Sequence, residues 1–280
     1  MTPRDSTAPE AVRAVVNYTG PMSETPRYHA HDHSRDVHVL DPQRVTIRNA
    51  RALQDAPALD REGFALVPHA SRVTSFLDAE QLQGTYAREV EQLICEVTGA
   101  CAAAVVAKPF VRFAESSSMS GRLDNSMPAR FVHIDYSDAR ARGLAEQHFP
   151  AARGRPAHLG RYAHYNLWRV LSQPPQDVPL AVCSARAVAD ADLVAALAVF
   201  DFPGVPERTA DSLVVRHNPA HQWHYFRDMR PDEALIFVTK ESDPDRPHQV
   251  PHSAFDDPSC PPGAAPRSSI EIRVVAYFAA

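Results

Sequence analysis

The sequence predicts a mainly β protein with flanking helices, built as an antiparallel barrel or a double-sheet jelly roll. Short runs rich in Val, Ile, Phe and Tyr dominate the chain after one early helical segment. The chain contains 25 Pro and 10 Gly, so we expect many loops that are held by Pro. The dinucleotide-binding, P-loop and nucleophile-elbow motifs are absent from the sequence, so dinucleotide-binding, nucleotide-binding and α/β-hydrolase functions have no motif to support them.

The N-terminal residues form a segment of different character. Residues 1–40 are predicted to be a loosely ordered arm, and residues 41–280 a single domain. The arm is polar and contains a His-rich run, HAHDHSRD, around His29, His31 and His33. A metal site confined to this run is the alternative to a mobile arm.

Hydrophobic spacing predicts a short strand and three helices. The strand covers residues 63–69, directly after a turn. Between residues 78 and 95 the apolar side chains recur at helical spacing, and Gly99 follows as a helix-ending residue. Residues 138–148 and 190–199 predict two further helices.

Eight more runs have the composition of strands, and loops rich in Pro, Asp and Ser separate most of them. They cover residues 105–113, 130–137, 165–171, 179–186, 211–218, 222–229, 233–240 and 270–278. Helices first and many short strands afterwards favour an antiparallel architecture over a parallel sheet.

Composition limits the class of partner. The 280 residues include 29 Lys and Arg against 34 Asp and Glu, a formal net charge of −5 with no long basic block. We therefore expect neither a nucleic-acid partner nor an anionic membrane. No run approaches the roughly 20 apolar residues of a membrane span, and the start, MTPRDSTAPE, lacks the apolar run of a signal peptide. Four Cys without a CxxC pair favour a cytoplasmic location.

A His and an Asp stand two residues apart in one of the predicted strands. Because alternate residues of a strand point to the same face, His133 and Asp135 converge while Ile134 points away. An imidazole and a carboxylate at this spacing can fill two adjacent positions around a metal. A third ligand would complete the two-His-one-carboxylate triad that holds Fe(II) and leaves positions open.

The third ligand is expected to be His252, about 120 residues downstream in HSAFDDP. His248, four residues earlier, is the competing candidate. An ordinary pair of polar residues on a half-buried strand is the structural alternative for HxD without such a partner.

The last predicted strand has a polar face. Arg267, Ser269, Glu271 and Arg273 alternate with Ile270 and its apolar neighbours, and a buried polar face needs partners or a ligand. An Arg with a hydroxyl beside it can grip a carboxylate, so Arg267 and Ser269 are a candidate clamp. For Glu271 and Arg273 we expect a structural ion pair.

This ordered set of residues resembles the iron(II)/2-oxoglutarate-dependent oxygenases. The resemblance narrows to the AsaB-type hydroxylase/desaturase family, which includes the cephamycin 7-alpha-hydroxylase component and fungal tailoring enzymes. It extends from about residue 15 to the C-terminus. The segments that carry it are PALDREGFALVPHASRVTSF, NLWRVL, PLAVCSAR, QWHYFRDM, HSAFDDP and PRSSIEIRVVAYF. Ser184 in PLAVCSAR departs from the Asp that is commoner in the family.

The resemblance implies a double-stranded β-helix, a jelly roll of the cupin-like kind. It implies that His133, Asp135 and His252 hold Fe(II), while Arg267 and Ser269 bind the C5 carboxylate of the co-substrate 2-oxoglutarate. The implied reaction uses O2 to hydroxylate, desaturate or oxidatively cyclise a small specialised metabolite, with succinate and carbon dioxide as co-products. The sequence does not select among these outcomes and does not indicate an oligomeric state.

Four residues are weaker candidates for contact with the substrate: Arg112, Trp168, Arg169 and Tyr225. Core packing is the alternative for the two aromatic side chains, and an ion pair is the alternative for Arg112. Two other functions stay open, a metal dioxygenase that does not use 2-oxoglutarate and a non-catalytic jelly-roll binding module.

Overall fold

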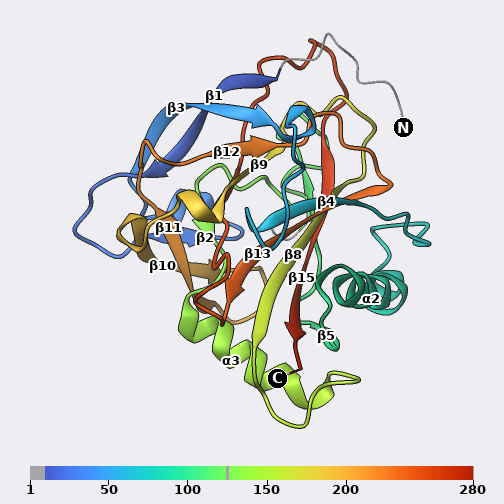
Figure 1. Cartoon of the computed structure of the whole chain (residues 1–280). Coiled ribbons are helices and arrows are strands. Elements are labelled where there is room, and N and C mark those ends of the chain that lie inside the picture. Colours follow the sequence, from blue (N-terminus) through green and yellow to red (C-terminus); the bar gives the residue numbers. More distant parts are fainter. Residues whose placement is uncertain (1–9, 124–125, 280) are drawn as a thin grey trace.

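The computed structural model describes residues 10–123 and 126–279, and it consists of two curled sheets with helices on the outside (Figure 1). The predicted mainly β fold with flanking helices is confirmed. Most neighbouring strands are antiparallel, and the two parallel pairs described are β10 with β2 and β12 with β3.

One sheet has nine strands and carries His133 and His252 on two of them. Its order is β1 (Ala11–Thr19), β3 (Leu40–Asn49), β12 (Trp223–Tyr225), β9 (Leu180–Cys183), β14 (His252–Ala254), β7 (His133–Ile134), β11 (Arg208–Val215), β10 (Leu193–Phe200) and β2 (Arg27–His29). The middle of this sheet is built from very short strands, because β7 has two residues and β14 has three. Segments from distant parts of the chain therefore meet there.

The other sheet has six strands, most of them longer. Four strands follow in the order β4 (Phe64–Pro68), β13 (Glu233–Glu241), β8 (Tyr162–Val170) and β15 (Ser268–Tyr277), and both β5 (Ala102–Val105) and β6 (Phe110–Phe113) pair with β15. One face of β8 points toward the nine-stranded sheet and the other packs under a helix, so nearly the whole strand is buried.

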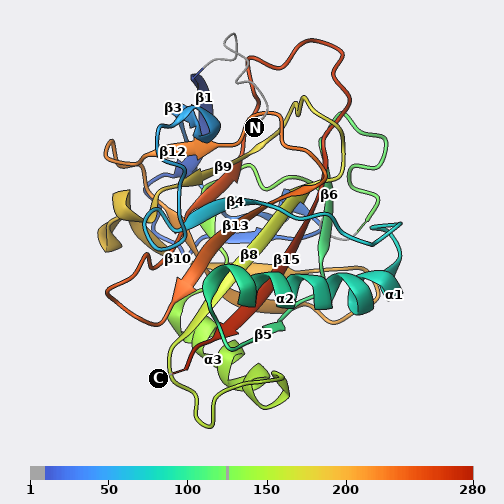
Figure 2. The same cartoon turned by 45° about the vertical axis from the view of Figure 1, so that its right-hand side comes forward.

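The long helix covers the outer face of the six-stranded sheet, and Figure 2 shows it crossing β13, β8 and β15. Asp78 caps the N-terminus of α1 (Ala79–Gln81), a π-helical turn (Leu82–Tyr86) follows, and α2 (Ala87–Thr98) continues the same rod. Gly99 ends it with φ +72°, a left-handed conformation that suits Gly. The side chains of Val90, Leu93 and Ile94 join the main hydrophobic core beneath.

The second predicted helix is also confirmed, and α3 spans Asp138–His148. The Ser137 hydroxyl accepts a hydrogen bond from the backbone N–H of Arg140 and caps its N-terminus. Among the described residues, no helix is long and apolar enough to cross a bilayer.

The helix predicted for residues 190–199 is wrong. A single 3-10 turn (Asp190–Asp192) leads directly into strand β10, which pairs with β11 over its full length. The Ala-rich segment LVAALAVF has a high helix propensity. The backbone hydrogen bonds that it forms with β11 outweigh this propensity, so the segment is a strand.

The loose arm predicted for residues 1–40 is contradicted from Ala11 onward. Strand β1 pairs with β3 along nine residues, and alternate side chains (Val12, Ala14, Val16 and Tyr18) are at most 7% exposed. These residues complete a second hydrophobic cluster with Ile47 and the aromatic side chains of β12. The alternation of apolar residues in AVRAVVNYT is thus the signal of a strand rather than of an arm.

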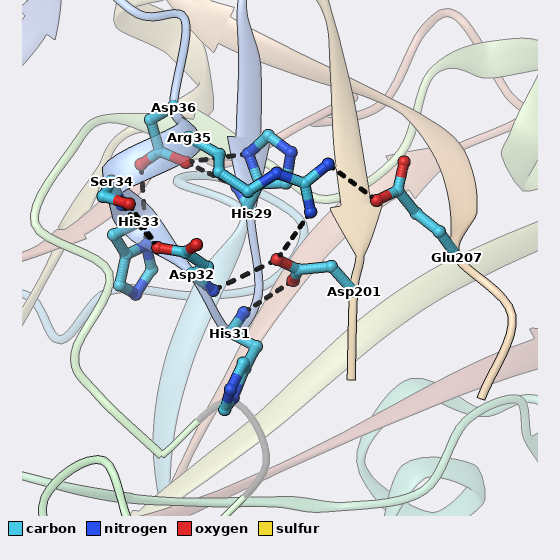
Figure 3. Close-up of polar contacts among 9 residues, drawn as sticks. All are labelled: His29, His31, Asp32, His33, Ser34, Arg35, Asp36, Asp201 and Glu207. Carbon is cyan, nitrogen blue, oxygen red and sulfur yellow. Dashed lines mark hydrogen bonds and ion pairs between the residues drawn. The ribbon is translucent and has the colours of Figure 1, made fainter. Parts of the chain in front are cut away.

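The His-rich run is also ordered, as a short loop pinned to the end of β10 (Figure 3). The carboxylate of Asp201 accepts hydrogen bonds from the backbone N–H groups of His31 and Asp32 at 2.9 and 3.2 Å. Asp36 accepts another from the backbone N–H of His29 at 2.6 Å, and the His31 ring points away from these carboxylates. The run is not part of the one group of potential metal ligands found in the described part of the chain.

Candidate metal centre

Three predicted ligands meet in the space between the two sheets. One nitrogen each from His133 and His252 and one oxygen from Asp135 all lie within 4.8 Å of one another, and the three residues are buried. The register of the sheet explains the meeting, because His252 on β14 stands directly opposite His133 on β7. Opposite residues of an antiparallel pair point to the same face, so the two rings lie 4.3 Å apart.

Both imidazoles are oriented for metal binding by the backbone of their own strands. Nδ1 of His133 donates to the carbonyl oxygen of Phe131 at 3.0 Å, and Nδ1 of His252 donates to that of Val250 at 3.2 Å. Each Nε2 therefore carries the lone pair and faces a carboxylate oxygen of Asp135 at 3.9 Å. The buried Nε2 of His252 has no hydrogen-bond partner among the described residues. A divalent cation would satisfy it, so the residues present fit a metal ion.

The protonation states suit the same role. Burial and the charge of the neighbouring His252 lower the pKa of His133 to about 3, which leaves the ring neutral. Burial opposes ionisation of Asp135, but the guanidinium of Arg273 and the two imidazoles outweigh it and lower the pKa of this carboxyl group. A neutral imidazole beside an anionic carboxylate is the donor set of a two-His-one-carboxylate Fe(II) centre.

Two further residues touch Asp135, and the sequence analysis did not include them among the site residues. Nδ2 of Asn166 donates to one carboxylate oxygen at 2.6 Å, and Nη2 of Arg273 donates to the other at 2.6 Å. The pattern of alternation contained a signal for both. Asn166 shares the inward face of its strand with Trp168, and Arg273 shares its face with Arg267.

A cavity extends from the imidazoles into the protein and holds about 350 Å³ of space, part of it open to solvent. Its walls are made of Arg112, Pro128, Ala129, His133, Trp168, Pro179, Leu180, His252, Ala254, Arg267 and Glu271. His133 and His252 of the candidate metal site and Arg267 of the candidate carboxylate clamp thus line one cavity.

Arg267 is buried in this cavity and is only 2% exposed. Its Nη1 donates to the hydroxyl of Ser269, while its Nε has no hydrogen-bond partner and the guanidinium forms no ion pair with a described residue. Burial, with the positive charge of Arg112 added, lowers the pKa of Arg267 to about 9. An anionic group in the cavity would stabilise a buried cation of this kind.

The structure separates the four weaker candidates into two pairs. Arg112 and Trp168 line the cavity, and the ring of Trp168 lies 5.9 Å from the guanidinium carbon of Arg267. Arg169 points to the opposite face of β8, where it donates to the carbonyl oxygen of His69. The ring of Tyr225 packs against Phe255 in the second hydrophobic cluster. Among the described residues, neither of the latter two lines the cavity, so their expected contact with substrate is corrected.

His248, the competing ligand candidate, lies at the surface. Its Nε2 is 3.1 Å from a carboxylate oxygen of Asp138 at the start of α3, and the side chain is 36% exposed. The pairing of β14 with β7 brings His252 to the site and leaves His248 outside it.

Comparison with known proteins points to oxidoreductases. A family profile described as an oxidoreductase/YMDC permease-like domain matches residues 14–277. The chain is 31% identical to hydroxylase/desaturase efuI of Hormonema carpetanum, over 84% of each chain. It is 30% identical to hydroxylase/desaturase CTB9 of Cercospora beticola, over 84% of this chain and 76% of the relative. The Fe(II)/2-oxoglutarate-dependent dioxygenase nvfI of Aspergillus novofumigatus is 28% identical over 84% of each chain.

A solved structure confirms the fold class. The iron and alpha-ketoglutarate-dependent endoperoxidase NvfI superposes with a TM-score of 0.81 over 98% of this chain and 99% of that chain, at 23% identity. The predicted double-stranded β-helix of the jelly-roll kind is therefore the fold of this protein.

Proposed function

The chain belongs to the oxidoreductase/YMDC permease-like family, whose profile spans nearly all of it, and we propose that it is an iron(II)/2-oxoglutarate-dependent oxygenase. Relatives named as hydroxylases, desaturases and 2-oxoglutarate-dependent dioxygenases support this function. Its substrate is a small specialised metabolite that is hydroxylated, desaturated or oxidatively cyclised, with succinate and carbon dioxide as co-products. The observation that carries this proposal is the cavity that joins His133 and His252 of the His-Asp-His group to Arg267, which has no anionic partner among the described residues.

We assign the roles as follows. His133, Asp135 and His252 hold Fe(II), and Arg267 with Ser269 binds the distal carboxylate of 2-oxoglutarate. When bound, the metal and co-substrate activate O2 for removal of a hydrogen atom from an unactivated C–H bond.

The other residues of the cavity position the co-substrate and the substrate. The guanidinium of Arg267 and the hydroxyl of Ser269 orient the co-substrate by gripping its far end, because a fork of donors matches a carboxylate. Pro179, Leu180 and Ala254 supply apolar walls that exclude water from the reacting end of the cavity. Arg112 and Trp168 are the side chains that we propose for contact with the substrate.

Three finer proposals follow from the sequence. We propose that the chain is of the AsaB-type hydroxylase/desaturase group, on the motifs that it shares with that group. We propose a cytoplasmic location, in keeping with four cysteines that are all free. We also propose a single oxygenase domain that begins at β1 rather than at residue 41.

Anaerobic titration tests the function. Addition of 2-oxoglutarate to the Fe(II)-loaded protein is expected to produce a visible charge-transfer band, and exposure to O2 is expected to yield succinate. Arg267→Gln should weaken 2-oxoglutarate binding at least 100-fold, because the distal carboxylate loses its charged partner. Arg142→Gln is the matched control, since Arg142 is 73% exposed on α3 and should leave the affinity unchanged.

Three other results would each contradict the proposal in a different way. Metal binding without the band indicates a dioxygenase that does not use 2-oxoglutarate. A band without succinate, across a panel of candidate metabolites, indicates a binding module. Equal 2-oxoglutarate affinity in the Arg267→Gln and Arg142→Gln proteins removes Arg267 from the site.

A further inference from the structure

We propose that Asn166 and Arg273 are positioning residues that clamp the Asp135 carboxylate from both sides and so hold it in one orientation toward the two imidazoles. This inference rests on the proposed function, because it concerns how the chain presents a ligand to the iron. It adds to that function two residues outside the His-Asp-His group.

The six-stranded sheet builds the clamp in register. Asn166 on β8 and Arg273 on β15 stand directly opposite each other, so their side chains project to the same face. Each holds a different oxygen of the carboxylate at 2.6 Å, Arg273 by Nη2 and Asn166 by Nδ2. The carboxylate itself comes from the other side of the cavity, directly after β7, and its side chain is 3% exposed.

Polar and ring contacts hold Arg273, and burial confines Asn166. Nε of Arg273 donates to Glu271 at 3.0 Å, and its guanidinium carbon lies 5.1 Å from the ring of Phe110 and 5.7 Å from that of Tyr136. Asn166 is fully buried on a strand that has paired neighbours on both sides. Rotation of the carboxylate would therefore break two short hydrogen bonds without moving either donor.

The charges of the clamp also favour a metal. A lone Arg beside Asp135 would cancel the negative charge that attracts a cation. Glu271 pairs with the same guanidinium, so the group of Asp135, Arg273 and Glu271 keeps a formal charge of −1. Arg273 can thus orient the carboxylate while the site remains attractive to a divalent ion.

The functional consequence is a ligand set that is already in place. The two imidazoles and the held carboxylate would present their donor atoms to a divalent ion without a further rearrangement of Asp135. Loss of either donor would free the carboxylate to turn, so the affinity for the ion would fall.

Mn(II) provides a probe that is independent of turnover. Electron paramagnetic resonance titration gives the dissociation constant of Mn(II), and water-proton relaxation gives the number of exchangeable waters on the bound ion. We expect Arg273→Gln and Asn166→Leu to raise the dissociation constant about 10- to 100-fold and to change the water count, because the freed carboxylate no longer keeps one orientation. Arg273→Lys keeps the charge and should recover part of the affinity.

Arg161→Gln is the matched control. Arg161 lies next to β8 in the same sheet, and its Nη2 is 2.6 Å from Glu241, so the variant loses an equally short ion pair far from the metal ligands. Its dissociation constant and water count should equal those of the parent protein. Parent-like values in both Arg273→Gln and Asn166→Leu would overturn the clamp and leave the oxygenase function intact. A parent protein that binds neither Mn(II) nor Fe(II) would overturn the oxygenase function and the clamp together.

Discussion

The partner of a single ring nitrogen distinguishes the two histidines that compete for the third ligand position. Nε2 of His252 is buried and faces Asp135, whereas Nε2 of His248 already lies against Asp138 at the surface. The two residues are four positions apart in the sequence, so the spacing alone admits either. His252 is the expected metal ligand, because its Nε2 is buried beside the carboxylate of Asp135.

We expect His252→Ala to weaken Fe(II) binding at least 100-fold and to abolish succinate formation, because one of three ligands is lost. His248→Ala should bind Fe(II) within twofold of the parent, since it removes only an exposed ion pair. Equilibrium dialysis of both variants measures the difference. Equal losses in the two variants would refute the assignment of His252.

A second residue-scale prediction concerns pH. His164 is fully buried on β8, donates through Nε2 to the carbonyl oxygen of Ala141, and burial lowers its pKa to about 4. The unfolded chain takes up a proton near pH 6.5 while the folded chain does not, so this residue lowers stability as the pH falls from about 6.5 to 4.

The His164→Gln variant should therefore lose part of the pH dependence of its unfolding free energy, up to about 1.4 kcal/mol per pH unit in that window. Urea denaturation of parent and variant at pH 4.5, 5.5 and 6.5 gives the two slopes. Parallel slopes would show that His164 titrates alike in the folded and unfolded chains.

At the scale of elements, the sequence predicted those structures whose signals are local. The long helix, α3 and the strand at residues 64–68 were recognisable from periodicity, capping residues and flanking Gly. Strand β1 was missed although its alternating apolar residues are a local signal, because the polar composition of residues 1–40 favoured an arm. Strand β10 was missed because its pairing partner, β11, lies elsewhere in the chain. No local pattern in LVAALAVF reports the presence of β11.

Two consecutive residues of β1 test its role. Val16 is 1% exposed on the inner face of the strand, and Val15 is 43% exposed on the outer face. Val16→Asp should lower the unfolding free energy by about 3 kcal/mol or more, because it buries a carboxylate without a partner. Val15→Asp should change it by less than about 0.5 kcal/mol. Chemical denaturation separates the two, and a tolerated Val16→Asp would restore the description of this segment as an arm.

At the scale of the whole molecule, the sequence predicted those site residues that lie on the same face of a single strand. The spacings of His133 with Asp135 and of Arg267 with Ser269 each define a pair in this way. The approach of Asn166 and Arg273 to Asp135 depends on how the two sheets face each other across the cavity. The packing of side chains between the two sheets sets how far apart they lie, so the sequence alone did not predict these contacts.

Metal binding should stabilise the entire fold, since the ligands lie on both short central strands. At 100 times its dissociation constant, a divalent ion that binds only the folded chain adds about 2.7 kcal/mol. For a chain of this size we expect a rise in melting temperature of about 5 °C, and His252→Ala should abolish it. Differential scanning fluorimetry with Mn(II) measures the rise. An equal rise in that variant would place the ion elsewhere.

The shortness of β7 and β14 has a mechanical consequence. Together β7 and β14 have only five residues, so few backbone hydrogen bonds join them at the centre of the nine-stranded sheet. Yet these two strands bring together segments that lie about 120 residues apart in the chain. A bound ion would act there as a removable cross-link that closes a very long loop, comparable to a disulfide in an oxidising compartment. Loss of the ion would then loosen the pairing of β7 with β14 first, while the longer strands of the six-stranded sheet stay paired.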